Sequence, residues 1–393
     1  MKILMISDVY FPRVNGVSTS IQTFRCELEA LGHETHLIAP AYPAAYPDEP
    51  DTVRVPSGFV PFDPEDRRMH PGAIRKIADT LADSGFDLVH VQTPFVAHYL
   101  GLEIARRLGV PCVETYHTFF EEYLFHYVPL LPKDWLRAVA RRFSRTQANR
   151  VDALVVPSTA MREVLDRYGV VTPMHVIPTG IPQGDFRAGD GQRFRAALHV
   201  AAGTPLLLFV GRVAHEKNIA FLLRAFVRAS ALMPGLEFVI AGEGPARRQL
   251  KRETARLGLG RRVHFVGYLD RRTALADCYA AADAFVFASR TETQGLVLLE
   301  AMAVGLPVIS TAVMGTRDIV GPRRGALVPA DDEGAFAEAI VRLASDPDLR
   351  ARLSCEAREY AREWHADTLA KRLAALYREV VDAASPGPVV LAG

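Results

Sequence analysis

The chain has 393 residues, which is long enough for two domains that each bury a core of their own. Its formal net charge of +1 excludes the large positive excess typical of proteins that bind nucleic acid, and 49% of its residues are hydrophobic. Its four cysteines lack CxxC spacing, which favours buried thiols in a reducing compartment over a disulfide framework or a metal site.

The beginning of the chain, Met-Lys-Ile-Leu-Met-Ile-Ser-Asp, has an apolar stretch too short for a signal peptide and predicts a first strand. No uninterrupted apolar run approaches the roughly 20 residues that a membrane-spanning helix needs. We therefore expect a cytoplasmic protein whose contact with a membrane is peripheral.

Strands and helices alternate from the N-terminus, as in a doubly wound parallel sheet. The pattern predicts strands at Lys2–Ser7 and His36–Ala39 with a helix at Ser18–Leu31 between them. Asn15-Gly16 lies just ahead of this helix. These two residues predict either a plain turn or a place where a ligand approaches the carboxyl edge of the sheet, and the sequence leaves both open.

Residues 40–72 are rich in proline and aspartate, so we expect loops there with one short strand at Thr52–Val55. The alternation then resumes with a strand at Asp87–Gln92, a helix at Ala97–Leu108 and a strand at Pro111–Thr115. His117 follows the end of that strand. A lone histidine is commonly structural, but a neutral imidazole at a strand end can also hydrogen-bond a sugar hydroxyl or stabilise a developing charge.

A basic amphipathic helix is predicted from Lys133 onward, after a segment at 119–132 that is aromatic and aliphatic but broken by prolines. At 100° per residue, one apolar stripe consists of Trp135, Leu136, Val139 and Phe143. The opposite row consists of Arg137, Arg141 and Arg145, and Arg142 adds to the positive charge. The helix is either an ordinary surface helix or a binding element for an anionic membrane surface, which a basic helix with aromatic residues suits.

The domain boundary is expected in the proline- and glycine-rich segment that begins at Val176, after a strand at Ala153–Val156 and a helix at Thr159–Tyr168. A second alternation of strands and helices then begins at Pro205. Its predicted strands are Leu206–Val210, Glu237–Ala241, Val263–Val266, Ala284–Ala288 and Val308–Ser310. The predicted divisions are residues 1–178, residues 179–363, and a final helix and tail at 364–393.

One strand, loop and helix unit carries the strongest signal for a ligand site. A strand at 284–288 leads into a polar loop, and a helix at Leu296–Val304 follows, closed by Gly305 and Pro307. Gly295 lies where the backbone must come close to something, and the free N–H groups of Leu296 and Val297 suit an anion such as a phosphate. Glu292 in the loop and Glu300 in the helix are expected to face the same crevice. Two carboxylates beside a phosphate require nearby cations.

Such cations occur at the end of the first strand of the second half. Arg212 and Lys217 lie in a strand-to-helix loop after Gly211, which is a usual place for phosphate ligands. Taken alone, this is an ordinary basic surface loop, but together with the acidic segment it predicts an anion site. Gly267-Tyr268, at the end of another strand, can supply backbone hydrogen bonds to a flat base.

An ordered set of motifs across almost the whole chain resembles the retaining glycosyltransferases of family 4. The set is Asn15-Gly16-Val17, His117-Thr118, Gly211-Arg212, Glu216-Lys217-Asn218, Gly242-Glu243-Gly244-Pro245 and the E-x7-E pair Glu292 and Glu300. The resemblance implies an α/β fold of the GT-B type, with two Rossmann-like doubly wound domains facing across a cleft. The second domain would bind a nucleotide sugar and the first an acceptor, and the final helix would cross back onto the first domain.

The resemblance also implies roles for individual residues. Arg212 and Lys217 would bind the diphosphate and stabilise it as it leaves, with the Leu296 and Val297 amides on a phosphate. Glu300 would hold the ribose hydroxyls, Glu292 the transferred sugar, and Gly267 and Tyr268 the base. Gly16 would close over the phosphate and sugar from the other domain, and His117 would contact the sugar. No metal or other cofactor is expected, and Asp346-Pro-Asp348 is expected to be a turn and helix cap.

The acceptor is a narrower prediction. The segment from Thr115 to Pro132 and Thr291 to Leu296 are similar to the bacterial diacylglycerol glucosyltransferases of this family, which implies UDP-glucose as donor and a lipid acceptor. The protein would then lie peripherally on the inner face of the cytoplasmic membrane. Mannosyl transfer to phosphatidylinositol, or transfer to a polyprenyl-linked or polysaccharide acceptor, stays open. So do a nucleotide-sugar epimerase, an inactive membrane-bound scaffold, and the oligomeric state.

Overall fold

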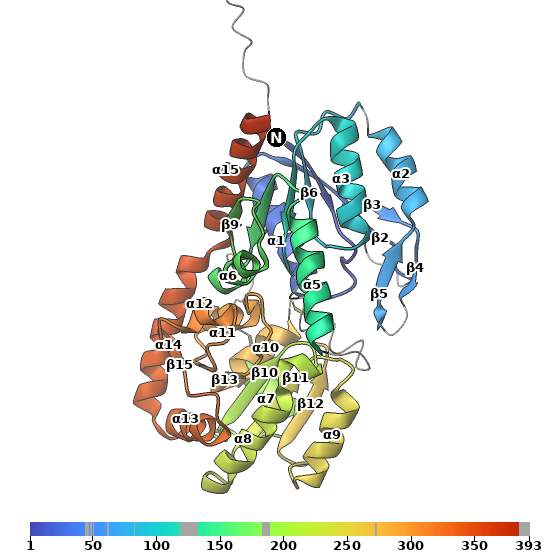
Figure 1. The fold of residues 1–393 in the computed structure, drawn as a ribbon. Coiled ribbons are helices and arrows are strands. Elements are labelled where there is room, and N and C mark those ends of the chain that lie inside the picture. The colour runs from blue at the N-terminus through green and yellow to red at the C-terminus, as the bar shows by residue number, and fades with distance from the viewer. Residues whose placement is uncertain are drawn as a thin grey trace, which may run out of the picture. The chain divides into compact units, whose positions relative to one another are not determined.

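The computed structural model describes residues 1–43, 47, 49, 51–60, 63–81, 83–117, 119, 133–182, 189–271 and 273–384. The chain forms two compact units, which are described separately (Figure 1). The first unit contains Met1–Gly180 and the segment from Ala366 onward, and the second contains Ile181–His365. The sequence had placed the divisions after residues 178 and 363.

The first unit is built on a parallel sheet of seven strands in the order β3-β2-β1-β6-β7-β8-β9. The strands are β1 Lys2–Ile6, β2 Glu34–Pro40, β3 Thr52–Val55, β6 Leu88–Val91, β7 Cys112–Thr115, β8 Ala153–Val156 and β9 Met174–Val176. The chain proceeds from β1 toward one edge through β2 and β3, and then from β6 toward the other. This reversal confirms the predicted doubly wound sheet.

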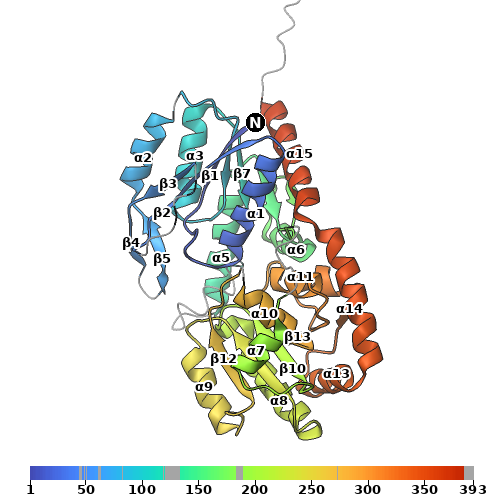
Figure 2. The ribbon, with the colours of Figure 1, turned by 180° about the vertical axis from the view of Figure 1, so that it is seen from behind.

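The helices of the first unit connect these strands, apart from one that comes from the far end of the sequence. They are α1 Gly16–Ala30, α2 Pro71–Thr80, α3 Val96–Leu108, α5 Lys133–Ala148, α6 Thr159–Tyr168 and α15 Ala366–Ala384. Helix α15 packs beside α1 (Figure 2), and its Leu369, Leu373 and Tyr377 share one buried cluster with Ile21 and Leu28. Helix α15 is therefore part of the first unit, although it follows the second unit in the sequence. The tail from Ser385 lies outside the described residues.

The segment at 40–72 is more ordered than the sequence predicted. After β3 it forms an antiparallel hairpin of β4 Ser57–Val60 and β5 Asp63–Met69, and α2 begins at Pro71. The predicted short strand at Thr52–Val55 is confirmed as β3, whereas the prediction that the rest of the segment forms loops was wrong. The sequence of β5, Asp-Pro-Glu-Asp-Arg-Arg-Met, lacks the alternation of apolar and polar residues by which a half-buried strand is recognised. Backbone pairing from Ser57↔Met69 to Val60↔Asp63 defines the hairpin instead.

The second unit has a parallel sheet of six strands in the order β12-β11-β10-β13-β14-β15. The strands are β10 Leu206–Val210, β11 Glu237–Ala241, β12 Val263–Gly267, β13 Ala284–Phe287, β14 Val308–Ser310 and β15 Ala326–Leu327. The first five agree with the prediction to within one residue at each end. The two-residue strand β15, which pairs with β14, is an addition.

Helices cover both faces of this second sheet. They are α7 Gly191–Ala197, α8 Ile219–Leu232, α9 Arg247–Arg256, α10 Ala274–Ala281, α11 Leu296–Ala303, α12 Thr316–Val320, α13 Glu333–Ser345 and α14 Pro347–Ala361, with 3-10 turns at η1 His215–Lys217 and η2 Arg362–Trp364. Asp346 caps α14 by accepting a hydrogen bond from the Leu349 amide at 2.9 Å, which is the cap role predicted for it. None of the described helices combines the length and apolar character needed to cross a bilayer.

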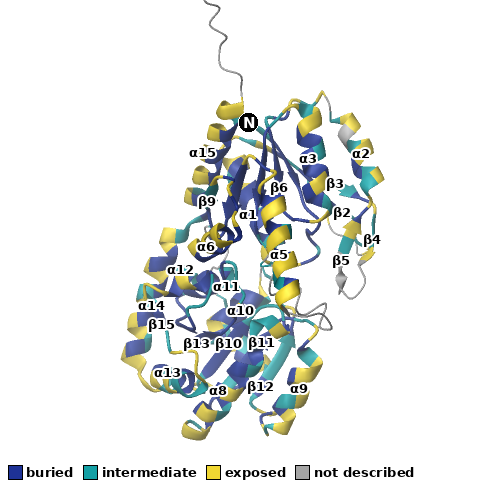
Figure 3. Cartoon of the chain, viewed as in Figure 1, coloured by how far each residue is buried: buried dark blue, intermediate teal, exposed yellow. Residues whose placement is uncertain are grey.

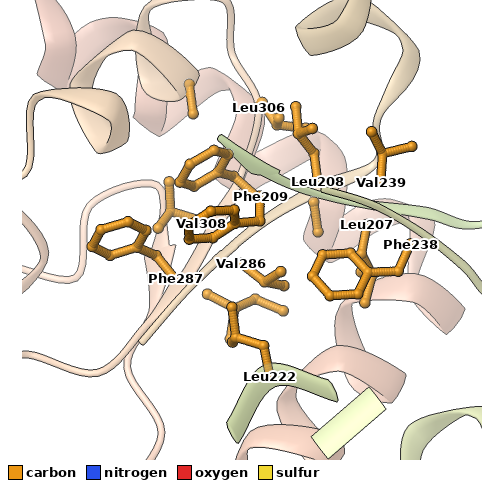
Figure 4. Packing of buried hydrophobic residues seen from close by; sticks show 14 of the residues in the cluster. Leu207, Leu208, Phe209, Leu222, Phe238, Val239, Val286, Phe287, Leu306 and Val308 are labelled. Atoms are coloured by element: carbon orange, nitrogen blue, oxygen red, sulfur yellow. The ribbon is translucent and has the colours of Figure 1, made fainter. Parts of the chain in front are cut away.

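The core of the second unit explains why its strands read as continuous apolar runs. Figure 4 shows Leu207, Phe209, Phe238 and Val286 packed together between the sheet and its helices. The rings of Phe209 and Phe287 stack with their centroids 5.8 Å apart. Strands covered by helices on both faces bury every side chain, so polar residues collect in the loops at the strand ends. The candidate site lies in those loops.

Candidate functional site

The loop after β13 and the helix α11 that follows form the centre of the candidate site. Gly295 precedes the helix with φ of 96°, a left-handed conformation that side chains other than glycine rarely adopt. No side chain caps this helix start, so the N–H dipoles of its first turn, including those of Leu296 and Val297, point out from the helix end. An uncapped helix N-terminus of this kind favours an anionic ligand.

The loop after β14 stabilises the conformation of the loop after β13, which contains Glu292. The Gly315 amide donates a hydrogen bond of 2.9 Å to the Glu292 carbonyl, and a Cβ on Gly315 would overlap the backbone of Thr293. The side chain of Thr316 donates to the carbonyls of Thr311 and Val313 and closes the turn at the start of α12. This support is not predicted from the sequence, in which its only signal is the Met-Gly-Thr turn after β14.

Lys217 and Glu292 form an ion pair that joins two neighbouring strand ends. Lys217 ends the turn η1 after β10, and Glu292 lies in the loop after β13. Two further hydrogen bonds join the same loops. Asn218 Nδ2 donates to the Ala288 carbonyl at 3.2 Å, and the Ser289 hydroxyl donates to the Glu216 carbonyl. Because β10 and β13 are adjacent in the sheet, these loops lie at one carboxyl edge. The structure therefore brings together the cation and the acid that the sequence singled out.

Arg212 follows β10 directly and belongs to the same edge. Its neighbours are fixed to the loop after β11, since the Val213 amide donates to the Glu243 carbonyl at 2.8 Å. Gly242 allows this close approach, because a Cβ there would overlap the Gly211 carbonyl oxygen. The glycines of the Gly242-Glu-Gly-Pro motif thus allow the two loop backbones to pack closely together. They also place Arg212 in a defined position at the strand end.

Glu300 is buried in the second turn of α11, with 2% of its surface exposed. Arg271 Nη2 donates to its Oε1 at 2.8 Å, and the hydroxyl of Tyr279 donates to its Oε2 at 3.0 Å. Burial, reinforced by the charge of Glu300, raises the pKa of Tyr279 well above its ordinary value, so the phenol stays a donor. Neither partner was singled out from the sequence. Each of the two acids therefore has its own cation, Lys217 for Glu292 and Arg271 for Glu300.

Gly267 and Tyr268 lie at the end of β12, the edge strand of the same sheet. The Gly267 carbonyl already accepts a hydrogen bond of 2.8 Å from the Gly242 amide. A carbonyl oxygen can accept a second bond, so this pairing leaves room for one ligand contact. The Tyr268 side chain is half exposed beside it.

His117 and Gly16 lie on the first unit, both after the carboxyl end of a strand. His117 follows β7, and its Nε2 lies 3.3 Å from Oε1 of Gln92, which follows β6. Burial lowers the pKa of His117 to about 4, so its imidazole is neutral at neutral pH. Gly16 begins α1 behind the cap made by Asn15, and an added Cβ would meet nothing within 4 Å. Thr118, from the same motif as His117, lies outside the described residues.

Helix α5 differs from its predicted amphipathic pattern. Leu136 is buried at 4% exposure, whereas Trp135 and Val139 are exposed at 55% and 41%, so the expected single apolar stripe is divided (Figure 3). The buried face of the helix also contains polar side chains, which form hydrogen bonds to other residues of the first unit. Ser144 bonds the Tyr116 hydroxyl at 2.7 Å, and Gln147 donates to the Pro94 carbonyl. Hydrophobicity alone could not reveal this face.

The exposed side of α5 forms a basic groove with α6. A cavity of about 450 Å³ is lined by Asp134, Arg137, Ala138, Arg141, Arg142, Arg145 and Tyr168. The Arg141 guanidinium lies 5.7 Å from the centre of the Tyr168 ring, and Arg137 pairs with Asp134 at 3.2 Å. Trp135 and Val139 are exposed on α5 at i and i+4 spacing, and Arg142 of the groove follows at i+7, so the three are neighbours on the helix surface. The aromatic segment at 120–132 lies outside the described residues.

Comparison with known proteins agrees with this arrangement. Residues 14–183 match the profile described as Glycosyltransferase Family 4, and residues 190–360 match that of Glycosyl transferases group 1. The alpha-monoglucosyldiacylglycerol synthase of Streptococcus pneumoniae (strain ATCC BAA-255 / R6) is 33% identical over 97% of this chain and 86% of its own length. A GDP-mannose-dependent alpha-mannosyltransferase of Mycolicibacterium smegmatis is 31% identical over 93% of this chain and 94% of its own.

Among solved structures, sucrose-phosphate synthase from Thermosynechococcus elongatus is similar in fold. The TM-score is 0.79 with 24% identity, and the match covers 97% of this chain and 99% of the other. The fold is thus GT-B, with two Rossmann-like α/β domains. The two profile matches and the similarity over nearly the full length show that this chain belongs to the group 1 glycosyltransferases and is an enzyme of that family.

Proposed function

We propose that the protein transfers glucose from UDP-glucose to diacylglycerol or glycosyl-diacylglycerol at an anionic membrane surface. The transfer would retain the anomeric configuration of the sugar and need no metal ion. The observation that carries the proposal is the meeting of Lys217, Glu292 and the open N-terminus of α11 at one strand edge. The named activity of the relative from Streptococcus pneumoniae supports the choice of sugar and acceptor.

The donor diphosphate would bind between the basic loop and α11. Arg212 and Lys217 supply two positive charges, and the Leu296 and Val297 amides supply two aligned N–H donors. Lys217 pairs with Glu292 in the structure, so diphosphate binding would draw the ammonium toward the phosphates. Glu292 would then be available to accept hydrogen bonds from hydroxyls of the sugar. The Gly267 carbonyl and the Tyr268 backbone would contact the base.

In the chemical step the bond between the anomeric carbon and the phosphate oxygen would break, and its electron pair would stay on the departing diphosphate. Arg212, Lys217 and the helix amides would stabilise this charge, as fixed donors do at sites of developing negative charge. The acceptor hydroxyl would attack the anomeric carbon from the same face, and its proton would pass to the departing phosphate oxygen. The neutral imidazole of His117 would hydrogen-bond the sugar, and Gly16 would let the α1 start approach the phosphate and sugar.

The acceptor would be taken from a bilayer by the first unit. Trp135 and Val139 are exposed apolar side chains on α5, and four arginines line the groove beside them. An exposed aromatic residue next to clustered arginines matches the physical requirements of an anionic interface, where apolar groups enter the headgroup region and cations contact phosphates. The protein would then bind peripherally to the inner face of the cytoplasmic membrane.

The test is a transfer assay with radiolabelled UDP-glucose and diacylglycerol in vesicles that contain an anionic phospholipid, with EDTA present. We expect a labelled glycolipid whose anomeric proton has the coupling constant of an α-glucoside. Glu292→Gln should abolish most of the product, whereas the control Glu333→Gln, in a surface pair with Arg224, should not. Product that forms only after a divalent metal is restored would contradict the metal-free mechanism.

A second candidate is mannosyl transfer to phosphatidylinositol, which the similarity to the mannosyltransferase of Mycolicibacterium smegmatis favours. The same assay separates the candidates when GDP-mannose and phosphatidylinositol replace the first donor and acceptor. Label that appears only in this second arm would replace glucosyl transfer by mannosyl transfer. Donor turnover that is independent of any added lipid would instead indicate an epimerase or a hydrolase.

A further inference from the structure

Glu300 is the most completely enclosed acid at the candidate donor site. Its side chain has 2% exposure, and each carboxylate oxygen accepts a hydrogen bond from a different part of the chain. Arg271, which donates to Oε1, lies in the loop between β12 and α10, and Tyr279, which donates to Oε2, lies in α10. Three separate elements therefore meet at this one carboxylate.

Two features of this arrangement bear on what Glu300 can bind. A buried carboxylate without a cation loses its charge or destabilises the fold, and the guanidinium of Arg271 removes that problem. An ionised carboxylate has about four acceptor positions, two on each oxygen. Arg271 and Tyr279 take one position on each oxygen. One position is left on Oε1 and one on Oε2, which suits two vicinal hydroxyl groups.

The two partners differ in exposure. Tyr279 is 1% exposed and packs against the Phe285 ring at 6.1 Å between centroids, so its hydroxyl is fixed. The Arg271 side chain is 29% exposed. The phenol of Tyr279 is therefore the more deeply buried of the two hydrogen-bond donors to Glu300, and the guanidinium of Arg271 is the more accessible one.

We infer that Arg271 and Tyr279 are positioning residues that orient the Glu300 carboxylate to accept hydrogen bonds from the two vicinal hydroxyls of a ribonucleotide ribose. This inference rests on the proposed donor site. It adds a reason for selectivity toward ribose, because Glu300 without its two supports would discriminate poorly between a ribose and a deoxyribose. Neither residue touches the reacting atoms.

The experiment measures selectivity for the hydroxyls by calorimetric titration of the full-length protein. UDP and GDP are titrated first, and the tighter-binding one is compared with its 2′,3′-dideoxy analogue. The ratio of the two dissociation constants isolates the contribution of the ribose hydroxyls. We expect Arg271→Met to lower this ratio about tenfold or more, and Tyr279→Phe about fivefold, since hydrogen bonds to charged groups are stronger than neutral ones.

Two further variants distinguish positioning from general structural damage. Arg271→Lys keeps the positive charge and should retain most of the selectivity. Arg224→Met removes a comparable arginine that pairs with Glu333 on the surface of the same unit, and the ratio should stay at the wild-type value. Thermal unfolding of each variant checks that it is folded. If Arg271→Met does not fold, Arg271→Lys and Tyr279→Phe carry the test.

The possible results separate this inference from the proposed function. The proposed donor site at Glu300 is wrong if the wild-type protein binds the nucleoside diphosphate and its 2′,3′-dideoxy analogue with equal dissociation constants. It is also wrong if the wild-type protein binds neither UDP nor GDP. If the wild type discriminates and a folded Arg271→Met or Tyr279→Phe variant keeps the full ratio, the positioning role of that residue is overturned while the donor site stands. Tighter binding by Arg271→Met would show that the guanidinium competes with ribose and does not prepare the site.

Discussion

Lys217 and Glu292 are the residues whose charges are most directly coupled at the candidate site. Both are partly buried, with 21% and 17% of their side chains exposed, so they are less screened by water than a surface pair. In the proposed reaction they separate, because Lys217 is needed by the diphosphate and Glu292 by the sugar. Their substitutions should therefore affect different steps.

We expect Lys217→Ala to weaken the binding of UDP and to lower kcat by about 100-fold, since it removes a cation that opposes the developing charge. Glu292→Gln should lower kcat by a similar factor while UDP, which lacks the sugar, binds with nearly unchanged affinity. Steady-state kinetics together with titration of UDP measures both effects. Equal loss of UDP affinity in the two variants would show that Glu292 contributes to phosphate binding or to folding, and not to holding the sugar.

His117 gives a prediction about pH. Its pKa of about 4 in the folded protein lies below the ordinary value of 6.5. Between these values the unfolded chain binds a proton that the folded protein does not, so this residue makes stability fall as the pH drops from 6.5 to 4. His117→Gln should flatten the pH dependence of the free energy of unfolding in that window. Denaturant titrations at several pH values measure the slope, and an unchanged slope would mean that His117 titrates normally.

The residues of the site differ in how far sequence could predict them. Glu292, Lys217 and Arg212 stand in short motifs at strand ends, where the alternation of strands and helices already places ligand-binding loops. Arg271 and Tyr279 contact Glu300 across 29 and 21 residues of sequence, from a different loop and helix. No periodicity links such positions. The need of a buried tyrosine for a hydrogen-bond partner was the one available signal.

At the scale of elements, two neighbouring residues of α5 allow the proposed membrane binding to be tested separately from the stability of the fold. Leu136 is buried, whereas Trp135 beside it is exposed. Trp135→Ser should leave the free energy of unfolding nearly unchanged and weaken binding to anionic vesicles. Leu136→Ser should destabilise the first unit by about 2–4 kcal/mol, because it places a polar group in the core. Vesicle sedimentation and denaturant unfolding give the two quantities, and vesicle binding that survives Trp135→Ser would remove this residue from the proposed interface.

The arginines of α5 give a charge test of the same element. Arg141→Glu combined with Arg145→Glu reverses the charge of the groove, and binding to anionic vesicles should fall by at least tenfold at low salt. Binding to neutral vesicles should change little. If the double variant sediments with anionic vesicles as the wild type does, the groove beside α5 is no membrane contact.

The hairpin β4–β5 and helix α5 show two ways in which sequence patterns fall short at this scale. In β5 the backbone pairs without an apolar face, so period-two alternation is absent. In α5 the docking face contains Ser144 and Gln147, whose buried hydrogen bonds depend on Tyr116 and Pro94 far away in sequence. Strands such as β10 and β13, by contrast, are apolar throughout and were predicted almost to the residue. A strand that is buried on both faces is recognisable in the sequence as a continuous apolar run. Hydrogen bonds between residues far apart in the chain leave no recognisable pattern in the sequence.

At the scale of the whole molecule, the last helix makes the stability of the first unit depend on the end of the chain. Leu373 in α15 is fully buried in the core of that unit, and the Tyr377 hydroxyl bonds Nδ1 of His90 in β6 at 2.6 Å. The other nitrogen of His90 bonds Thr115 at the end of β7, two residues before His117. Alternating elements predicted the two sheets, and the family resemblance implied this return of the chain, while the neighbours of α15 could not be inferred.

We expect Leu373→Ala to destabilise the first unit by about 3 kcal/mol through lost burial and the remaining cavity. Calorimetry in the presence and absence of UDP should assign the transitions, because a ligand raises the unfolding temperature of the unit that binds it. The substitution should lower the transition that UDP does not raise. A shift confined to the UDP-stabilised transition would contradict the assignment of α15 to the first unit.

The structure of the protein with bound UDP tests the central claim most directly. We predict that the diphosphate lies within hydrogen-bonding distance of Lys217 Nζ and of the Leu296 and Val297 amides, with the ribose hydroxyls at Glu300. UDP bound with its phosphates in the arginine groove beside α5, or anywhere away from the strand edge that holds Lys217 and Glu292, would contradict the account.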